Sequence, residues 1–125
     1  MRLIPCIEML YKAEHPDFIE RFRAAKADGF DAVDMWLWRD KPLDAIVDVM
    51  AETGVQVFSF GVDPRASLVN PAEHATVLAG VRDAVPVARR LGGAHMFTPT
   101  NPNVKCTKAE FPMLEKPTKM MPGPM

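Results

Sequence analysis

The chain has 125 residues and a hydrophobic fraction of 48%, which is enough for one domain with a core but not for two. Its 15 basic and 16 acidic residues leave a formal net charge of −1, so electrostatics favour neither a nucleic acid nor an anionic membrane as partner. No apolar run approaches the roughly 20 residues of a membrane span. The N-terminal residues also lack the apolar core of a secretory signal. We therefore expect a cytoplasmic protein.

Short sequence motifs give no indication of a catalytic or cofactor-binding function. The two cysteines, Cys6 and Cys106, lie far apart and form no CxxC pair, which favours free thiols in a reducing compartment. The phosphate-binding, dinucleotide-binding, zinc-protease and serine-hydrolase motifs do not occur either.

The first part of the chain alternates strand-like and helix-like patterns. Leu3 to Met9 is a strand candidate, with Pro5 tolerable near its start. A helix should begin at Pro16 and stop at Gly29, with an apolar face of Phe18, Phe22 and Ala25. Ala32 to Trp38 is the second strand.

Two further helix–strand pairs follow. Asp40 is a plausible N-cap for a helix that ends at Gly54, and its inward face holds Leu43, Ile46, Val47 and Met50. Val55 to Phe60 is rich in β-branched and aromatic residues and reads as a strand. Asn70 then caps a helix that Gly92 and Gly93 stop, and Ala94 to Thr98 is a short fourth strand.

Alternating strands and helices of these lengths predict an α/β fold of parallel strands with right-handed crossovers. Two architectures remain open on pattern alone, namely part of an eight-stranded α/β barrel or an open doubly wound sheet. A complete barrel needs roughly 200–250 residues, so this chain could supply only part of one.

Composition changes near residue 100. Residues 101–125 hold five of the 12 prolines and four of the nine methionines, and their charge is +2 against −3 for residues 1–100. They show no helical or strand period, so we expect an irregular tail after a domain that spans residues 1–100.

Several segments, in order and spacing, resemble hydroxypyruvate isomerase, a member of the xylose isomerase-like TIM barrel superfamily of sugar isomerases and epimerases. The resemblance covers residues 2 to about 98 and is carried by residues 6–11, 18–22, 27–36, 42–44, 52–57 and 87–92. It implies four strands and three helices of a TIM barrel, and interconversion of hydroxypyruvate and tartronate semialdehyde.

In that family a divalent metal (Mg²⁺, Mn²⁺ or Zn²⁺) stabilises the ene-diolate intermediate while a carboxylate moves the proton. The resemblance places the family's metal ligands and catalytic glutamates mainly on strands five to eight, so no residue here inherits those roles. The stretch from Phe60 to Pro64 also departs from the family's usual Asn-Leu-Pro-Ala-Gly-like loop.

Four residues are candidates for contact with a small hydroxy-carbonyl or sugar substrate. Strand alternation puts Asp34 and Trp36 on one face, with Val33, Met35 and Leu37 toward the helices. Glu8 ends the first predicted strand, and His95 lies on the fourth. Active sites of such barrels form at the carboxyl ends of the strands. We also considered that Glu8, Asp34 and His95 together hold a metal. Structural roles for these side chains remain open.

We therefore expect an isomerase of the aldose–ketose type that is weak or inactive as an isolated chain. The alternatives are an inactive truncated or frameshifted fragment, a half-barrel that needs a partner chain, and a flavodoxin-like binding module. Because a partial barrel leaves strand edges and an apolar face open, we expect self-association or a complementing chain.

Overall fold

The computed structural model describes residues 1–100. In chain order its elements are α1 (Phe18–Ala27), β1 (Ala32–Leu37), α2 (Leu43–Thr53), β2 (Gln56–Gly61), the 3₁₀ turn η1 (Pro71–Glu73), α3 (His74–Arg90) and β3 (His95–Phe97). The predicted irregular tail, 101–125, lies outside the described residues. Among the helices of residues 1–100, none has the length and apolar character needed to cross a membrane.

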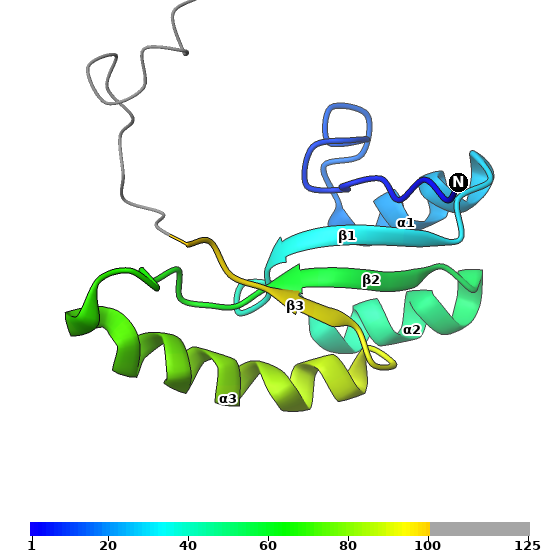
Figure 1. Ribbon diagram of the computed structural model, residues 1–125. Coiled ribbons are helices and arrows are strands. Elements are labelled where there is room, and N and C mark those ends of the chain that lie inside the picture. Colours follow the sequence, from blue (N-terminus) through cyan, green and yellow to red (C-terminus); the bar gives the residue numbers. More distant parts are fainter. Residues whose placement is uncertain (101–125) are drawn as a thin grey trace, which may run out of the picture.

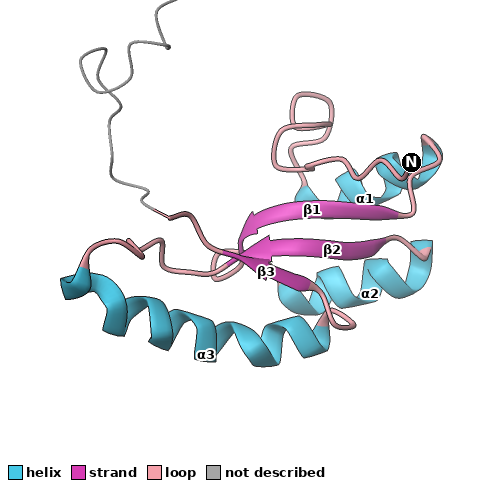
Figure 2. Ribbon diagram, viewed as in Figure 1, coloured by secondary structure: helices cyan, strands magenta, loops and turns pink. Residues whose placement is uncertain are grey.

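The strands form one parallel sheet in the order β1-β2-β3, and their arrowheads all point the same way in Figure 2. A single bridge between Cys6 and Asp34 adds the N-terminal segment on the other side of β1. The order is therefore consecutive along the chain, as a barrel requires. A flavodoxin-like sheet would place its first strand between the second and third, so that alternative is wrong.

The core lies between the sheet and its helices (Figure 1). Along β1, Val33 and Met35 are fully buried, whereas Asp34 is half-buried and Trp36 is 41% exposed. Successive side chains of a strand point to opposite faces, which confirms the predicted alternation. Phe22, Ile46, Phe60 and Leu91 are among the largest fully buried side chains of this core.

The N-terminal segment departs from the prediction, because Leu3 to Met9 does not form a regular strand. Its pairing with β1 consists of two bonds, from Asp34 N to Pro5 O (2.9 Å) and from Ile7 N to Asp34 O (3.0 Å). The chain then turns, since the Cys6 carbonyl accepts the amides of Met9 and Leu10. The turn ends the pairing after one bridge.

Arg21 holds this turn in place. Its side chain is buried, and it donates to three main-chain carbonyls, those of Ile7 (2.9 Å), His15 (2.8 Å) and Pro16 (3.2 Å). A buried guanidinium needs several acceptors because it cannot lose its charge. Arg21 thus attaches the irregular N-terminal segment to α1.

Two predicted helix starts are wrong by a few residues. α1 begins at Phe18 rather than Pro16, because the Asp17 carboxylate accepts the Ile19 amide (3.0 Å) and caps the helix. Asp40 does not cap α2, which begins at Leu43 after Pro42 and has no side-chain cap. The Asp40 carboxylate lies instead 3.4 Å from Lys41 Nζ.

Asn70 behaves as predicted at the next helix start. Its side chain accepts the Ala72 amide (3.1 Å), and η1 leads directly into α3. The predicted helix end at Gly54 is also confirmed, and this residue adopts a left-handed conformation with φ of 73°. Side-chain caps therefore fix the starts of α1 and η1, whereas α3 itself begins after Glu73 without one.

We predict that Arg21→Met destabilises the domain by about 2–3 kcal/mol, because it leaves buried carbonyls without donors. Urea unfolding measures the loss. Arg23→Met is the matched control, since Arg23 is exposed and pairs with Glu20 and Glu52 at the surface. Equal losses in the two variants would contradict the role given to Arg21.

The Tyr11 hydroxyl donates to Asp28 Oδ2 (2.6 Å) and joins the N-terminal segment to the end of α1. Burial, with this bond and the Asp28 charge, raises the pKa of Tyr11 from 10.0 to about 12. The folded state thus holds the phenolic proton more tightly than the unfolded state. The resulting stabilisation is complete below pH 10 and is lost as pH rises from 10 to 12.

We therefore predict that the wild-type free energy of unfolding falls more steeply across this pH window than that of Tyr11→Phe. Urea titrations at pH values on both sides of the window measure the slopes. Parallel pH profiles for the two proteins would refute the prediction.

Candidate functional site

The face of the sheet opposite the helices, called here the open face, carries the candidate site. Between the first two pairs of the ladder β2 contains one extra residue, since Val33 pairs with Val57 but Asp34 pairs with Ser59; the original register returns where Leu37 pairs with Gly61. Phe58 is that extra residue. Neither Phe58 nor Ser59 joins the core, whereas Val57 does. The irregularity thus gives β2 two consecutive side chains on the open face.

A polar row crosses this face. Cys6 pairs with Asp34, Asp34 with Ser59, and Ser59 with His95, so one residue comes from each of four neighbouring chain segments. The Ser59 hydroxyl donates to Asp34 Oδ1 at 2.7 Å. That contact leaves the second carboxylate oxygen of Asp34 able to accept a bond from a ligand hydroxyl.

His95 is exposed and held by two contacts. Its ring stacks on Phe58 at a centroid distance of 4.7 Å, and its Nδ1 lies 3.2 Å from the Phe58 carbonyl oxygen. A carbonyl can only accept, so this geometry assigns the proton to Nδ1 and leaves Nε2 as an acceptor in the neutral ring. The predicted position of His95 on the last strand is confirmed, and its side chain shares a row with Ser59.

An apolar row lies one step nearer the carboxyl ends of the strands. Phe97 packs against Gly61. A Cβ atom at Gly61 would lie 3.3 Å from the Phe97 ring and 3.5 Å from the Trp36 backbone. Trp36 and Phe97 are each less than half exposed. The absence of a side chain at Gly61 therefore lets the Phe97 ring lie close to the backbone of β1 at Trp36, beside the polar row.

Glu8 lies at the same end of the sheet. Its Oε1 accepts the Trp36 amide (3.0 Å) and pairs with Lys41 Nζ (2.6 Å). Lys41 also donates to the Leu37 carbonyl (2.9 Å) and lies over the Phe18 ring. Both charged side chains are mostly buried. This ion pair ties the N-terminal turn to the end of β1.

The structure thus places all four predicted site residues on or beside the open face, yet it does not gather them around one point. Asp34 and His95 are two strand spacings apart, about 10 Å between backbones, with Ser59 between them. Glu8 is engaged by Lys41. Residues 1–100 contain no group of three acidic, histidine or cysteine side chains able to hold a metal. The proposed Glu8–Asp34–His95 metal set is wrong.

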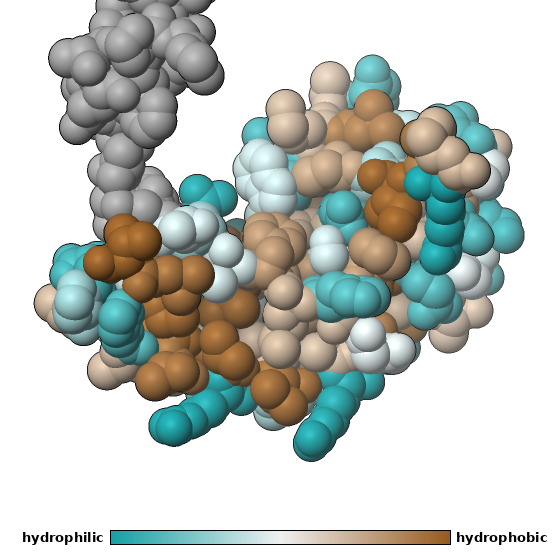
Figure 3. All heavy atoms as spheres, viewed as in Figure 1, coloured by the Kyte–Doolittle hydropathy of each residue, from teal (hydrophilic) through white to brown (hydrophobic). Residues whose placement is uncertain are grey.

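Two hollows lie outside this face. A cavity of about 310 Å³ is lined by Leu68, His74, Val77 and Leu78, where apolar side chains gather over the start of α3 (Figure 3). It offers almost no polar groups to fix a ligand.

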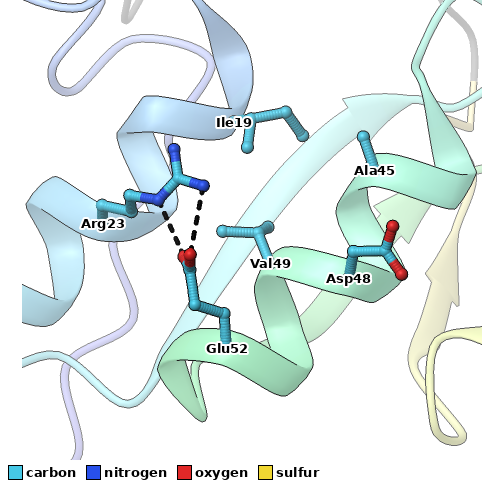
Figure 4. A pocket seen from close by; sticks show the side chains of 6 residues that line it. All are labelled: Ile19, Arg23, Ala45, Asp48, Val49 and Glu52. Atoms are coloured by element: carbon cyan, nitrogen blue, oxygen red, sulfur yellow. Dashed lines mark hydrogen bonds and ion pairs between the residues drawn. The ribbon is translucent and has the colours of Figure 1, made fainter.

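A second cavity, of about 180 Å³, lies between α1 and α2 (Figure 4). Arg23 reaches across it to Glu52, with bonds of 2.7 and 3.3 Å. The hydrogen bond from Arg23 lowers the pKa of the Glu52 carboxyl. This pair joins two helices on the outer surface, away from the open face.

Sequence reasoning missed Ser59, Lys41 and Phe97. Ser59 could have been found from its place on a strand beside Asp34, but the extra residue at Phe58 changes the pairing. Lys41 lies in the loop between β1 and α2, at the carboxyl end of the strand, where barrel sites form. Its pairing with Glu8 depends on the turn of the N-terminal segment.

Comparison with known proteins supports the fold. No family model matches the chain, and no curated protein matches it. Among solved structures it is similar to the crystal structure of an AP endonuclease, family 2, from Brucella melitensis, with a TM-score of 0.66 and 22% identity. The match covers 73% of this chain and 37% of that one. This chain therefore has the α/β fold of part of a TIM barrel, as the sequence predicts.

We predict that Lys41→Met destabilises the domain by about 2–3 kcal/mol, because it leaves the mostly buried Glu8 carboxylate without its cation. Adding Glu8→Gln to this variant should recover part of the loss. Urea unfolding of the two single variants and the double variant measures the coupling. Lys12→Met, at an exposed lysine, is the control. Additive effects at positions 8 and 41 would show that the pair contributes nothing.

Proposed function

We propose that this chain forms the substrate-binding half of a sugar isomerase of the hydroxypyruvate isomerase type. The single observation that carries the proposal is the polar row on the open face, with the Asp34–Ser59 hydrogen bond at its centre. The resemblance in sequence and the barrel fold supply the reaction class.

In this reaction a proton leaves C3 of hydroxypyruvate and another is added at C2, while the carbonyl group moves from C2 to C3. The substrate presents a hydroxyl, a carbonyl and a carboxylate within three carbons. Asp34 Oδ2 accepts the substrate hydroxyl, because its Oδ1 already binds Ser59. The His95 ring, when protonated, offers Nε2–H to the substrate carboxylate.

The aromatic residues supply the wall of the site. Trp36 and Phe97 cover the carbon chain of a small substrate and exclude water from one side of it. Glu8 acts as a positioning residue, since its Oε1 holds the Trp36 amide. Lys41 in turn holds Glu8.

The described residues do not fit the divalent metal of the isomerase family. Asp34 has one carboxylate oxygen engaged by Ser59, Glu8 is paired with Lys41, and no third ligand lies close to either. The proposal therefore assigns binding and orientation to residues 1–100 and routes no step through a metal. We expect little or no turnover of hydroxypyruvate by this 125-residue chain alone.

The second candidate is an inactive fragment. It is favoured because none of the roles proposed for residues 1–100 includes a carboxylate that transfers a proton. It differs from the first in predicting no selective ligand binding. A polynucleotide substrate, which the name of the structural neighbour suggests, is not favoured by the net charge of −1.

The test is a titration of the ¹⁵N-labelled chain with hydroxypyruvate, followed by amide chemical shifts. We predict that the amides of Trp36, Ser59 and His95 shift most, and that Asp34→Ala weakens binding at least about tenfold through loss of a charge-assisted bond. Pyruvate, which lacks the hydroxyl, should bind more weakly than hydroxypyruvate.

Asp48→Ala is the matched control, because Asp48 lies on α2 beside the outer cavity. It should leave the affinity unchanged. Shifts that scatter over the surface, or equal affinity for both ligands, would favour the inactive fragment.

A further inference from the structure

We propose that two copies of this chain close face to face into a two-fold barrel, in which each open face becomes one half of the interior. The inference rests on the barrel fold and on the strand edges; its consequence for the site rests on the proposed function. An eight-stranded barrel needs eight neighbouring parallel segments. One copy supplies four, namely the Cys6 segment and the three strands.

Both outer edges of the four-segment sheet have backbone groups directed outward. Phe97 turns its carbonyl toward β2, where it accepts the Val62 amide (2.8 Å). Alternate residues of a parallel strand bond to opposite neighbours, so the adjacent Met96 directs its N–H and C=O away from β2. Within residues 1–100 no strand pairs with that side of β3.

The same reasoning applies at the other edge. Pro5 and Ile7 both bond to Asp34, so Cys6 directs its N–H away from β1. The Cys6 C=O accepts the Met9 and Leu10 amides within the turn, so the Cys6 N–H is the group that this edge offers to another chain. The two edges are different surfaces of one molecule, and all strands run in the same direction, so the edge of β3 can accept the Cys6 edge of a second copy.

A two-fold axis makes this contact twice and leaves no edge open. When copies join through two different surfaces, the assembly forms a closed ring if the rotation between copies completes a full turn, and it forms filaments otherwise. Four segments per copy and eight per barrel require a half turn, which closes after two copies. This count favours a second copy over the Pro- and Lys-rich residues 101–125, whose sequence contains no strand-like period.

Exposed apolar side chains lie along both edges. Leu3, Met9 and Leu10 are exposed near the Cys6 edge, and Met96 and Phe97 are exposed at β3. Trp36 and Phe58 add to the apolar surface of the open face. Burial of such surface is the main favourable contribution to association.

Closure would complete the site. In one copy the polar row faces solvent on its free side, whereas in the two-fold barrel the Asp34 carboxylates of both copies face a shared interior. Each copy would then supply the missing wall of the other copy's site. Ligand affinity should rise with protein concentration as dimers form.

The test is sedimentation velocity of the full 125-residue chain over a concentration series, with Trp fluorescence on the same samples. We expect a species of twice the 13.9 kDa chain mass and a blue shift as Trp36 becomes buried. Met96→Pro removes the outward N–H without touching the Phe97 carbonyl bond to β2, and should weaken dimerisation by about tenfold or more. Met96→Val retains the amide and should dimerise normally.

A monodisperse monomer at every concentration would overturn the proposal, as would filaments or a dimer that Met96→Pro leaves unchanged while its circular dichroism stays native. If Met96→Pro fails to fold, the wild-type mass and fluorescence still decide the matter. These measurements use no ligand. A negative result would therefore contradict the dimer without contradicting the proposed binding of hydroxypyruvate, which the amide titration tests separately.

Discussion

The alternation of side chains along β1 divides this sheet into two chemically different faces, and the rest of the molecule depends on that division. Val33 and Met35 pack beneath the helices, and Asp34 and Trp36 point the other way. A slip of one residue would place the Asp34 carboxylate in the core without a partner, which costs far more than the apolar contacts could recover. Hydrophobic burial therefore fixes the position of the candidate site residues.

Cross-strand pairing then decides which of these residues meet. Ser59 occupies the place beside Asp34 because β2 accommodates Phe58 as an extra residue. The same pairing puts His95 beyond Ser59. A metal bonded to protein ligands at about 2 Å cannot join side chains separated by two strand spacings unless they converge. The row suits an extended ligand with several polar groups better than a single ion.

Two buried cations compensate for the incomplete first strand. Arg21 binds three carbonyls of the N-terminal segment, and Lys41 binds the Glu8 carboxylate and the end of β1. With only two backbone bonds to β1, the segment would otherwise be weakly held. These side chains give the Glu8 end of the candidate site a defined position. They also explain why a segment with strand-like composition turns away after one bridge.

Local patterns along the chain are sufficient to predict the alternating elements, their order, the buried face of β1 and the caps at Asn70 and Gly54. Each follows from local periodicity or from the side chain of one residue. Three features arise only when distant segments pack together: Glu8 pairs with Lys41, Ser59 lies between Asp34 and His95, and the N-terminal strand is reduced to a single bridge. Those outcomes depend on contacts between residues about 25 to 40 positions apart, and on an extra residue in β2 that no local pattern predicts.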